Sequence, residues 1–431
     1  MGVELLSPAG RRKSMRYAFA YGADAVYIGQ PRYSLRVREN EFSREEKIAE
    51  AIAEAHDIGK KVYIASNVSP HNNKVKTYLR DMKPVIEMNP DALIMADPGL
   101  IMMVREQWPD MPIHLSVQAN AVNYATVKFW QQIGLTRIIL SRELSLDEID
   151  EIKQACPEME LEVFVHGALC IAYSGRCLLS GYMTHRDPNQ GACTNSCRWK
   201  YDTVEAEQTL EGNINPIAAE PPKVSSDQVF LLEEKERPGE LMPAFEDEHG
   251  TYIMNSKDLR AVQHVGRLVK MGVDSLKIEG RTKSHFYAAR TAQVYRRAID
   301  DAEAGREFDM KMLEELESLA NRGYTEGFYR RHLPNEMQAY EDNRSAHLQQ
   351  QFVGELFEND SGDILVDVKN RFSIGDQMEL MTPTGNHSFT LNGLYDAKGN
   401  AVEVAPGSGH VVRVDGLPID AAQHGLLMRA V

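Results

Sequence analysis

Short apolar runs alternate with amphipathic segments from the start of the chain to about residue 300. The runs are rich in Val, Ile, Leu and Tyr, end in turn-forming or polar residues, and predict eight β-strands. These strands span residues 3–8, 25–29, 61–67, 92–97, 113–118, 137–141, 161–167 and 275–280. Between them, apolar positions recur at helical spacing. The clearest predicted helices are 12–22, 43–59, 74–88, 123–134 and 145–155.

The ends of several predicted helices carry recognisable signals. Gly22, Gly59 and Gly134 each stand between a helical pattern and the next strand, as glycine does at a helix C-terminus. Ser145 precedes Glu148 by three residues, which is the spacing of an N-terminal capping box. These signals fix the order as strand, helix, strand.

Strand–helix alternation predicts a parallel sheet with helices packed against it. Eight units within about 300 residues predict an α/β fold of the (β/α)8 TIM-like barrel type over residues 1–335. A doubly wound open sheet is the alternative. No Gly-x-Gly-x-x-Gly follows the first strand, which weakens the dinucleotide-binding version of that alternative.

Two regions interrupt the alternation. Residues 168–255 form a long insertion before the eighth strand; it carries cysteines and then a polar, acidic stretch at 211–228 that predicts a surface loop. Residues 351–431 contain short alternating runs separated by turn signals, which predict a small C-terminal all-β, barrel-like domain. Residues 336–350 are predicted to link the two domains.

Composition narrows the class of protein. The chain has 431 residues, of which 43% are hydrophobic, enough for a sizeable core. No apolar run reaches the roughly 18–20 residues that cross a bilayer, and the start lacks a signal-peptide pattern. We therefore expect a cytoplasmic protein with no membrane partner.

Charge is unevenly distributed along the chain. The net charge of −15 argues against nonspecific nucleic-acid binding. Residues 202–248 carry 13 acidic and 3 basic side chains, whereas residues 257–297 carry 10 basic and 3 acidic ones. The second segment predicts a local basic face that an RNA could meet.

Polar residues stand at the carboxyl ends of the predicted strands, where barrel enzymes build their active sites. Any one of them could be polar only because strand ends reach water, but as a set they indicate an enzyme site. His166 is either a catalytic group or a core histidine, and we predict that it reaches the barrel mouth. The full set is Ser7, Gln30, Asn67, Asp97, Gln118, Asn120, Arg142, Glu143, His166, Glu279 and Arg281.

Four of the five cysteines, Cys170, Cys177, Cys193 and Cys197, fall within 28 residues. Sparse cysteines argue against a disulfide scaffold, and Cys156, which stands apart, is interpreted as a packing residue. Four thiolates from one loop can bind zinc or an iron–sulfur cluster. Only the last two approach zinc-knuckle spacing, and the small flanking residues suit a cluster better. Zinc and unligated cysteines remain alternatives.

A cysteine beside a histidine could also act as a peptidase pair. That hypothesis explains one or two cysteines and not four. The sequence contains no Gly-x-Ser-x-Gly and no His-Glu-x-x-His, so hydrolysis has no further motif in its support.

Residues 162–180, "EVFVHGALCIAYSGRCLLS", resemble the signature of the collagenase-like peptidase family U32. The stretches "RDPNQGACTNSCRW" and "SLKIEGRTKS" are similar to its tRNA hydroxylation protein P branch. This resemblance implies an oxygen-independent, prephenate-dependent hydroxylation of wobble uridine to 5-hydroxyuridine. It also implies an iron–sulfur cluster, of the [4Fe-4S] type, bound by the four clustered cysteines. Some related branches take the fourth ligand from farther along the chain; here no cysteine follows Cys197, so Cys197 would serve.

The implied reaction assigns roles to the strand-end residues. Prephenate is a dicarboxylate, which suits the guanidinium forks of Arg142 and Arg281. Further candidates for substrate binding are Gln118, Asn120 and Asn67, and candidates for catalysis are His166, Glu143 and Glu279.

The implied RNA partner also has a predicted place. An anticodon loop presents splayed bases to a pocket while its phosphates stay outside. Residues 257–297 and the N-terminal arginines are predicted to form the phosphate-binding rim. The alternatives are a peptidase and a non-catalytic RNA-binding protein with a structural cluster. The sequence predicts no oligomeric state. The N-terminal arginines are Arg11, Arg12, Arg16, Arg32, Arg36 and Arg38.

Overall fold

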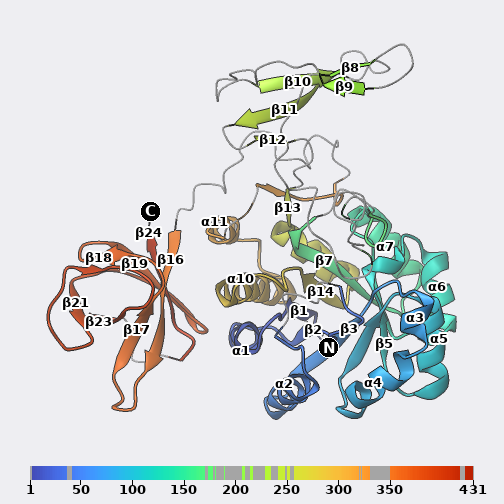
Figure 1. The fold of residues 1–431 in the computed structure, drawn as a ribbon, viewed down its shortest axis with the longest axis horizontal. Helices are drawn as coiled ribbons and strands as arrows, with labels where there is room; N and C mark the ends of the chain where they lie inside the picture. The colour runs from blue at the N-terminus through green and yellow to red at the C-terminus, as the bar shows by residue number, and fades with distance from the viewer. Residues whose placement is uncertain are drawn as a thin grey trace.

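Eight parallel strands close into a barrel in this computed structural model (Figure 1). Strand β14 pairs in parallel with both β1 and β7, which closes the sheet and confirms the predicted TIM-like barrel. The barrel strands are β1 (Glu4–Pro8), β2 (Ala25–Gly29), β3 (Lys61–Ser66), β4 (Ala92–Met95), β5 (Ile113–Leu115), β6 (Arg137–Ile139), β7 (Glu160–Ala168) and β14 (Ser275–Ile278). The structure describes residues 2–35, 41–169, 173–177, 180, 189, 206–208, 214–216, 229–233, 241–247, 250–252, 257–319, 321, 323–330, 350–417 and 423–430.

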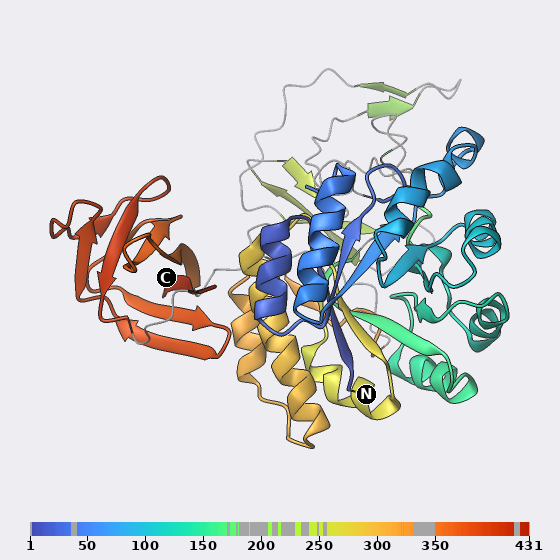
Figure 2. The same cartoon turned by 90° about the horizontal axis from the view of Figure 1, so that it is seen from below.

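Helices surround the barrel (Figure 2). Gly22, Gly59 and Gly134 have positive φ at the ends of three of them, as predicted, and both bonds of the Ser145–Glu148 capping box are present. None of the described helices is long and apolar enough to cross a membrane. The helices are α1 (Arg12–Ala20), α2 (Glu45–Asp57), α3 (Asn72–Val75), α4 (Tyr78–Glu87), α5 (Pro98–Gln107), α6 (Tyr124–Gln132), α7 (Leu146–Ala155), α9 (Val265–Met271), α10 (His285–Glu303) and α11 (Lys311–Glu317), with 3-10 turns η2 (Val117–Ala119) and η5 (Val262–His264).

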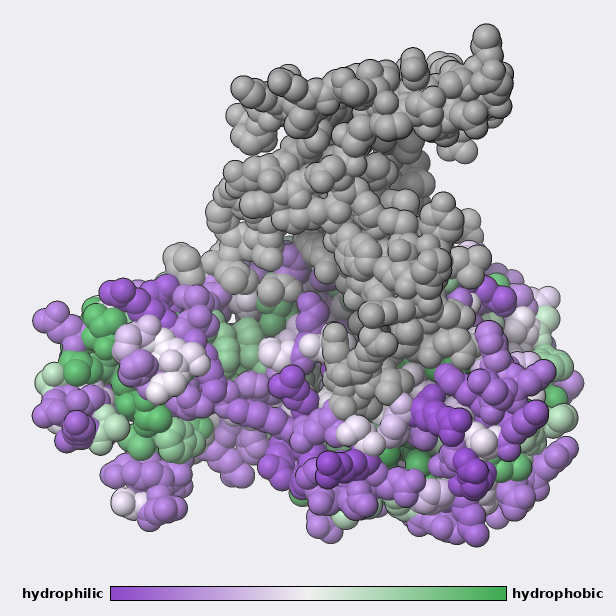
Figure 3. Space-filling view, viewed as in Figure 1, coloured by the Kyte–Doolittle hydropathy of each residue, from purple (hydrophilic) through white to green (hydrophobic). Residues whose placement is uncertain are grey.

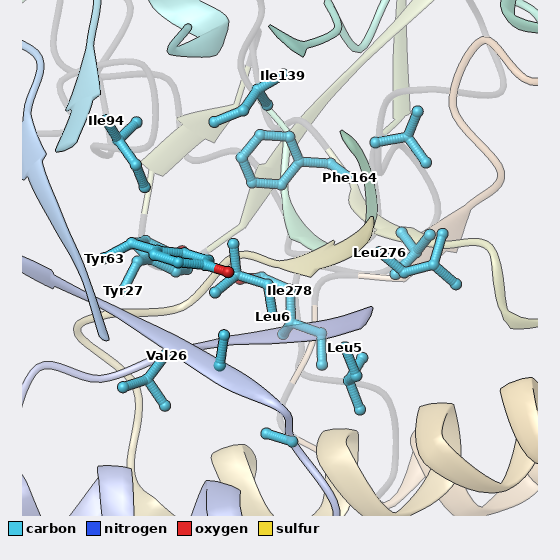
Figure 4. Close-up of a cluster of buried hydrophobic side chains, with 14 of the residues drawn as sticks. Leu5, Leu6, Val26, Tyr27, Tyr63, Ile94, Ile139, Phe164, Leu276 and Ile278 are labelled. Carbon is cyan, nitrogen blue, oxygen red and sulfur yellow. The ribbon is translucent and has the colours of Figure 1, made fainter. Parts of the chain in front are cut away.

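The barrel interior combines apolar and charged side chains. Figure 4 shows Tyr27, Tyr63 and Phe164, from three strands, among aliphatic side chains. Buried charges lie in the same interior: the Lys277 ammonium is 2.7 Å from Glu162 Oε1. Arg137 Nη1 lies 3.2 Å from Glu162 Oε2 and 2.5 Å from Glu4 Oε1. Two carboxylates and two cations therefore balance inside the barrel.

The insertion after β7 contains strands that the sequence did not predict. Residues 214–216 form β9 within the stretch expected to be a loop, and the rest of 211–228 lies outside the described residues. Just after the insertion, strand β13 (Asp258–Arg260) pairs antiparallel with β7 and parallel with β15 (Tyr324–Thr325). The other strands are β8 (Ala206–Gln208) and β9 (Ile214–Pro216), which pair with each other, and the antiparallel set β10 (Val229–Glu233), β11 (Leu241–Asp247) and β12 (Gly250–Tyr252).

The C-terminal residues form an antiparallel sheet domain, which confirms the predicted all-β fold. Its seven-stranded sheet has the order β20-β19-β24-β16-β17-β23-β21, and β18 pairs with β22. Residue 350 already belongs to β16, and the rest of the predicted linker, 336–349, lies outside the described residues. The strands are β16 (Gln350–Glu358), β17 (Ile364–Val368), β18 (Phe372–Ser373), β19 (Gln377–Thr382), β20 (Gly385–Thr390), β21 (Gly393–Asp396), β22 (Val404–Ala405), β23 (Val411–Asp415) and β24 (Leu426–Ala430).

The two domains share a buried interface along α1 and α10. The hydroxyl of Tyr21, the residue after α1, donates to the carbonyl of Met381 at 3.0 Å. Arg290 Nη2 on α10 lies 2.6 Å from Glu379 Oε1. Burial alone would raise the pKa of Glu355 on β16, but hydrogen bonds from His285 and Lys13 outweigh it and lower that pKa to about 2. These contacts hold the C-terminal domain against the barrel. Figure 3 shows mostly hydrophilic side chains over the described surface in that view.

Candidate active site

Three of the predicted strand-end residues meet at the mouth of the barrel. Arg142 follows β6, and Glu279 and Arg281 follow β14. Arg142 Nη2 lies 3.6 Å from Glu279 Oε2, and both side chains are nearly buried, at 11% and 13% exposed. Arg281 Nη1 donates to Ser34 Oγ at 2.7 Å, which orients its guanidinium. The structure therefore brings together two arginines and one carboxylate that are far apart in the sequence.

Two aromatic rings lie between these charges and the barrel interior. The Arg142 guanidinium lies 3.8 Å from the centroid of the Phe164 ring, and that of Arg281 lies 5.5 Å from the Tyr27 centroid. The Lys277 ammonium on β14 lies 4.5 Å from the centroid of the Tyr27 ring and 5.5 Å from that of the Phe164 ring. Each ring thus contacts two cations, and such contacts are favourable when desolvated.

Tyr27 is a mouth residue that the sequence reasoning missed. Its hydroxyl donates to the Ile278 carbonyl at 3.0 Å and lies 3.3 Å from Glu279 Oε2. Alternation along β2 would place Ile28, and not Tyr27, on the face of the predicted strand-end residue Gln30, so the sequence carried no signal for Tyr27.

The geometry suits the binding of a small carboxylate. Arg142 and Arg281 offer planar guanidinium groups, which pair with carboxylates through two parallel hydrogen bonds. Burial of the site strengthens such contacts relative to water. Glu279, the carboxylate beside them, can accept or donate a proton. The arrangement can therefore bind an anion next to a proton-transfer group.

Two other predicted residues have structural partners. Asn67 Nδ2 donates to Ser116 Oγ at 3.2 Å, and its Oδ1 accepts from the backbone N–H of Leu35 at 3.3 Å. The Glu143 carboxylate accepts a hydrogen bond from Ser141 Oγ. Asn67 therefore ties the loop after β2 to the loop after β5, and Glu143 is held beside the end of β6.

Gln118 and Asn120 hold the cysteine-bearing segment against the mouth. Asn120 Nδ2 donates to the carbonyl of Ser174 at 2.9 Å. Gly175, with φ of +72°, packs so closely that a Cβ atom there would lie 2.6 Å from Gln118 Oε1. Residues 173–177 therefore lie over the end of β5, and these two predicted substrate-binding residues position that segment.

Cys177 is the described member of the cysteine cluster. Its thiol is free and half-buried, and its carbonyl accepts from Asn189 Nδ2 at 3.0 Å. A free thiol fixed beside the mouth fits the role of a metal ligand. Cys170, Cys193 and Cys197 lie outside the described residues. Within the described part, no group of three or more His, Cys, Asp or Glu side chains could hold a metal ion.

His166 does not reach the mouth, so that prediction is wrong. Its side chain is fully buried, and Nδ1 lies 3.3 Å from the Tyr295 hydroxyl on α10. Burial, with smaller contributions from Arg260 and Lys283, lowers the pKa of His166 to about 3, so the imidazole is neutral at neutral pH. A catalytic role for His166 stays a prediction that this position does not favour.

The predicted basic rim is largely neutralised by acidic partners. On the N-terminal side, Arg12 and Arg16 both pair with Glu54, and Arg32 pairs with Asp81. Arg36 and Arg38 lie outside the described residues. In the basic segment 257–297, at least six of the ten basic side chains form ion pairs: Arg260, Arg267, Lys277, Arg290, Arg296 and Arg297.

Comparison with known proteins identifies the family. The model of peptidase family U32 matches residues 10–339, and that of the U32 C-terminal domain matches residues 348–429. The chain is 63% identical to tRNA hydroxylation protein P of Escherichia coli (strain K12), over 99% of this chain and 96% of that protein. It is 59% identical to the protein of the same name from Haemophilus influenzae, with the same coverage of both chains.

More distant relatives include a 23S rRNA 5-hydroxycytidine synthase of Escherichia coli, which is 32% identical over 69% of this chain and 39% of that protein. Among solved structures, the U32 peptidase Mk0906 matches with a TM-score of 0.38 and 13% identity, over 65% of this chain and 94% of that one. The two family models together span nearly the whole sequence. The chain therefore belongs to peptidase family U32.

Proposed function

We propose that this protein hydroxylates the wobble uridine of tRNA to 5-hydroxyuridine without oxygen, with prephenate as the co-substrate. The observation that carries the proposal is the 63% identity, over 99% of the chain, to a protein named tRNA hydroxylation protein P. The matched region covers both domains, so it spans the barrel mouth and the C-terminal sheet. The geometry of the mouth supports the same reaction class.

The mouth residues would bind and orient the co-substrate. Prephenate carries two carboxylates, and Arg142 and Arg281 offer two guanidinium groups at the mouth, where Arg142 lies beside Glu279. Hydroxylation at C5 of uridine breaks the C5–H bond and is a two-electron oxidation. Glu279 lies where it could accept the C5 proton, and the two electrons would pass to the co-substrate or the bound cluster. Tyr27, which lies 3.3 Å from Glu279 Oε2, would hold that carboxylate in place.

The cysteine cluster would hold a [4Fe-4S] cluster through Cys170, Cys177, Cys193 and Cys197. Cys177 supports this assignment, because its thiol is free and its loop is anchored by Gln118 and Asn120. A cysteine-bound cluster supplies one-electron transfer when it is bound. The chain's contribution is to fix the loop beside the arginines.

The peptidase alternative lacks support in the described residues. There, His166 contacts the Tyr295 hydroxyl rather than a thiol. The thiol of Cys156 lies 3.6 Å from the carbonyl of Tyr124, and burial raises its pKa, so it is a poor nucleophile.

The function is tested by nucleoside analysis of cellular tRNA. We expect 5-hydroxyuridine and its derivatives to disappear, in mass spectrometry of digested tRNA, from cells that lack the gene. A plasmid carrying the gene should restore them. Unchanged nucleosides in the deleted cells would favour the peptidase or the non-catalytic RNA-binding protein.

Arg142→Met and Arg281→Met should each weaken use of the co-substrate. Loss of a charge-assisted bidentate contact is expected to raise the KM for prephenate about 100-fold. The matched control is Arg267→Met, an exposed ion-paired arginine on α9. Steady-state assays with saturating tRNA provide the measurement, and an unaltered KM in both mouth variants would remove prephenate from this site.

A further inference from the structure

A cleft of about 250 Å³ lies between the barrel and the C-terminal domain. Its barrel side includes Lys283, Phe286 and Tyr287, around the start of α10. Phe352 of β16 and Asn370 of the turn after β17 line its other side. The cleft is therefore built from both domains, and neither domain forms it alone.

One wall of the cleft touches the candidate active site. The hydroxyl of Tyr287 donates to the carbonyl of Glu279 at 2.7 Å. The next residue, Gly280, packs against the same ring: a Cβ atom there would lie 2.5 Å from Tyr287 Cε1. A molecule bound against Tyr287 is thus separated from the mouth only by the residues that follow β14.

The chemistry of the walls favours a flat, anionic ligand. Phe286 and Phe352 stack across the domain boundary, with ring centroids 5.0 Å apart and planes 5° apart. Lys283 Nζ lies 5.5 Å from the centroid of the Tyr287 ring. Aromatic rings close to a cation are the features with which proteins hold single-stranded nucleotides: bases pack against the rings and the cation meets a phosphate.

We propose that this cleft binds an unstacked nucleotide of the tRNA, close in the chain to the uridine that is modified. The inference rests on the proposed function, since it takes tRNA as the substrate. The base lies against Tyr287 and Phe352, and its phosphate faces Lys283. The C-terminal domain thereby becomes part of the RNA-binding surface and does more than pack against the barrel.

The test uses the full-length protein and unmodified tRNA purified from cells that lack the gene. Asn370→Trp places a large ring at the cleft from an exposed turn position, and Ser361→Trp adds the same ring to another exposed turn of the domain as its control. We expect the Kd for tRNA to rise about tenfold in Asn370→Trp and to stay unchanged in Ser361→Trp.

Lys283→Ala tests the phosphate contact independently of the filled cleft. It is expected to lower the slope of log Kd against log salt by about one, which is the contribution of one phosphate contact. Lys270→Ala, at an exposed position of α9, should leave the slope unchanged. Wild-type binding in both Asn370→Trp and Lys283→Ala overturns the cleft proposal while the proposed function stands. Wild-type protein that neither binds nor modifies tRNA would instead overturn the proposed function.

Discussion

Glu162→Gln is expected to lower the free energy of unfolding by about 3–5 kcal/mol, because it leaves a buried ammonium without its carboxylate. Glu162 is fully buried and Lys277 is only 3% exposed. Burial lowers the pKa of Lys277, and Glu162 provides the largest opposing effect. Chemical denaturation at pH 7 measures the loss.

Glu160→Gln is the matched control. Glu160 lies two residues away on the same strand and also accepts from Arg137, at 2.8 Å, but its side chain is 49% exposed. An exposed ion pair contributes little, so this variant should lose less than about 1 kcal/mol. Equal losses of unfolding free energy in the two variants would show that burial does not increase the contribution of the Glu162–Lys277 pair to stability.

The pH dependence of the Glu162→Gln variant provides a second measurement. The pKa of Lys277 in the folded state is below its unfolded value, so between the two values the unfolded chain binds more protons and stability rises with pH. Without Glu162 the folded-state pKa falls further, and this window begins at a lower pH. The stability gap between variant and wild type should therefore narrow as the pH rises from 7 toward the pKa of Lys277.

The barrel could be predicted because its signals are local. Apolar runs alternate with helical patterns, and helix ends carry glycines such as Gly22 or a capping box such as Ser145–Glu148. Strand ends in a barrel share one face, so the sequence alone was enough to place Arg142, Glu279 and Arg281 together. The Glu162–Lys277 pair could not be predicted in this way, because neither residue stands at a strand end and the pair depends on the register between β7 and β14.

The direction of His166 could not be predicted, because it depends on a strand irregularity. Lys277 pairs with Phe164, and the next residue, Ile278, pairs with His166, so β7 has one extra residue at this point. A bulge breaks the two-residue alternation and turns the following side chain to the other face. His166 thus faces the tyrosines of α10, whereas regular alternation would direct it inward with Phe164.

The basic rim stays a prediction, but its ion pairs weaken the charge argument on which it depends. Charge counts along residues 257–297 do not include partners from other segments. Arg290 meets Glu379 of the C-terminal domain, and Arg267 meets Asp147 of α7. Segment charge predicts a surface field only when the side chains remain unpaired. The charge count of the segment is therefore no measure of its affinity for RNA phosphates.

Cys177→Ala is expected to abolish both iron binding and hydroxylation, with little change in the stability of the barrel. The loop that carries Cys177 is held through backbone groups: the carbonyl of Ser174 accepts from Asn120, and Gly175 packs on Gln118. Removal of a half-buried thiol leaves those contacts intact. Loss of one of four cysteine ligands, by contrast, removes an essential anchor of a cluster.

Cys156→Ala separates the loss of a ligand from the loss of any cysteine. Cys156 caps the end of α7, and burial raises the pKa of its thiol, so it stays protonated at neutral pH and is a poor iron ligand. This variant should keep its iron and its 5-hydroxyuridine activity. Both proteins are purified without oxygen, and iron content, visible absorbance and tRNA nucleosides are measured together. If Cys177→Ala retains iron at the wild-type level, Cys177 is not one of the ligands. Loss of iron can be assigned to the missing thiol, because the loop is held through Ser174 and Gly175 and not through that thiol.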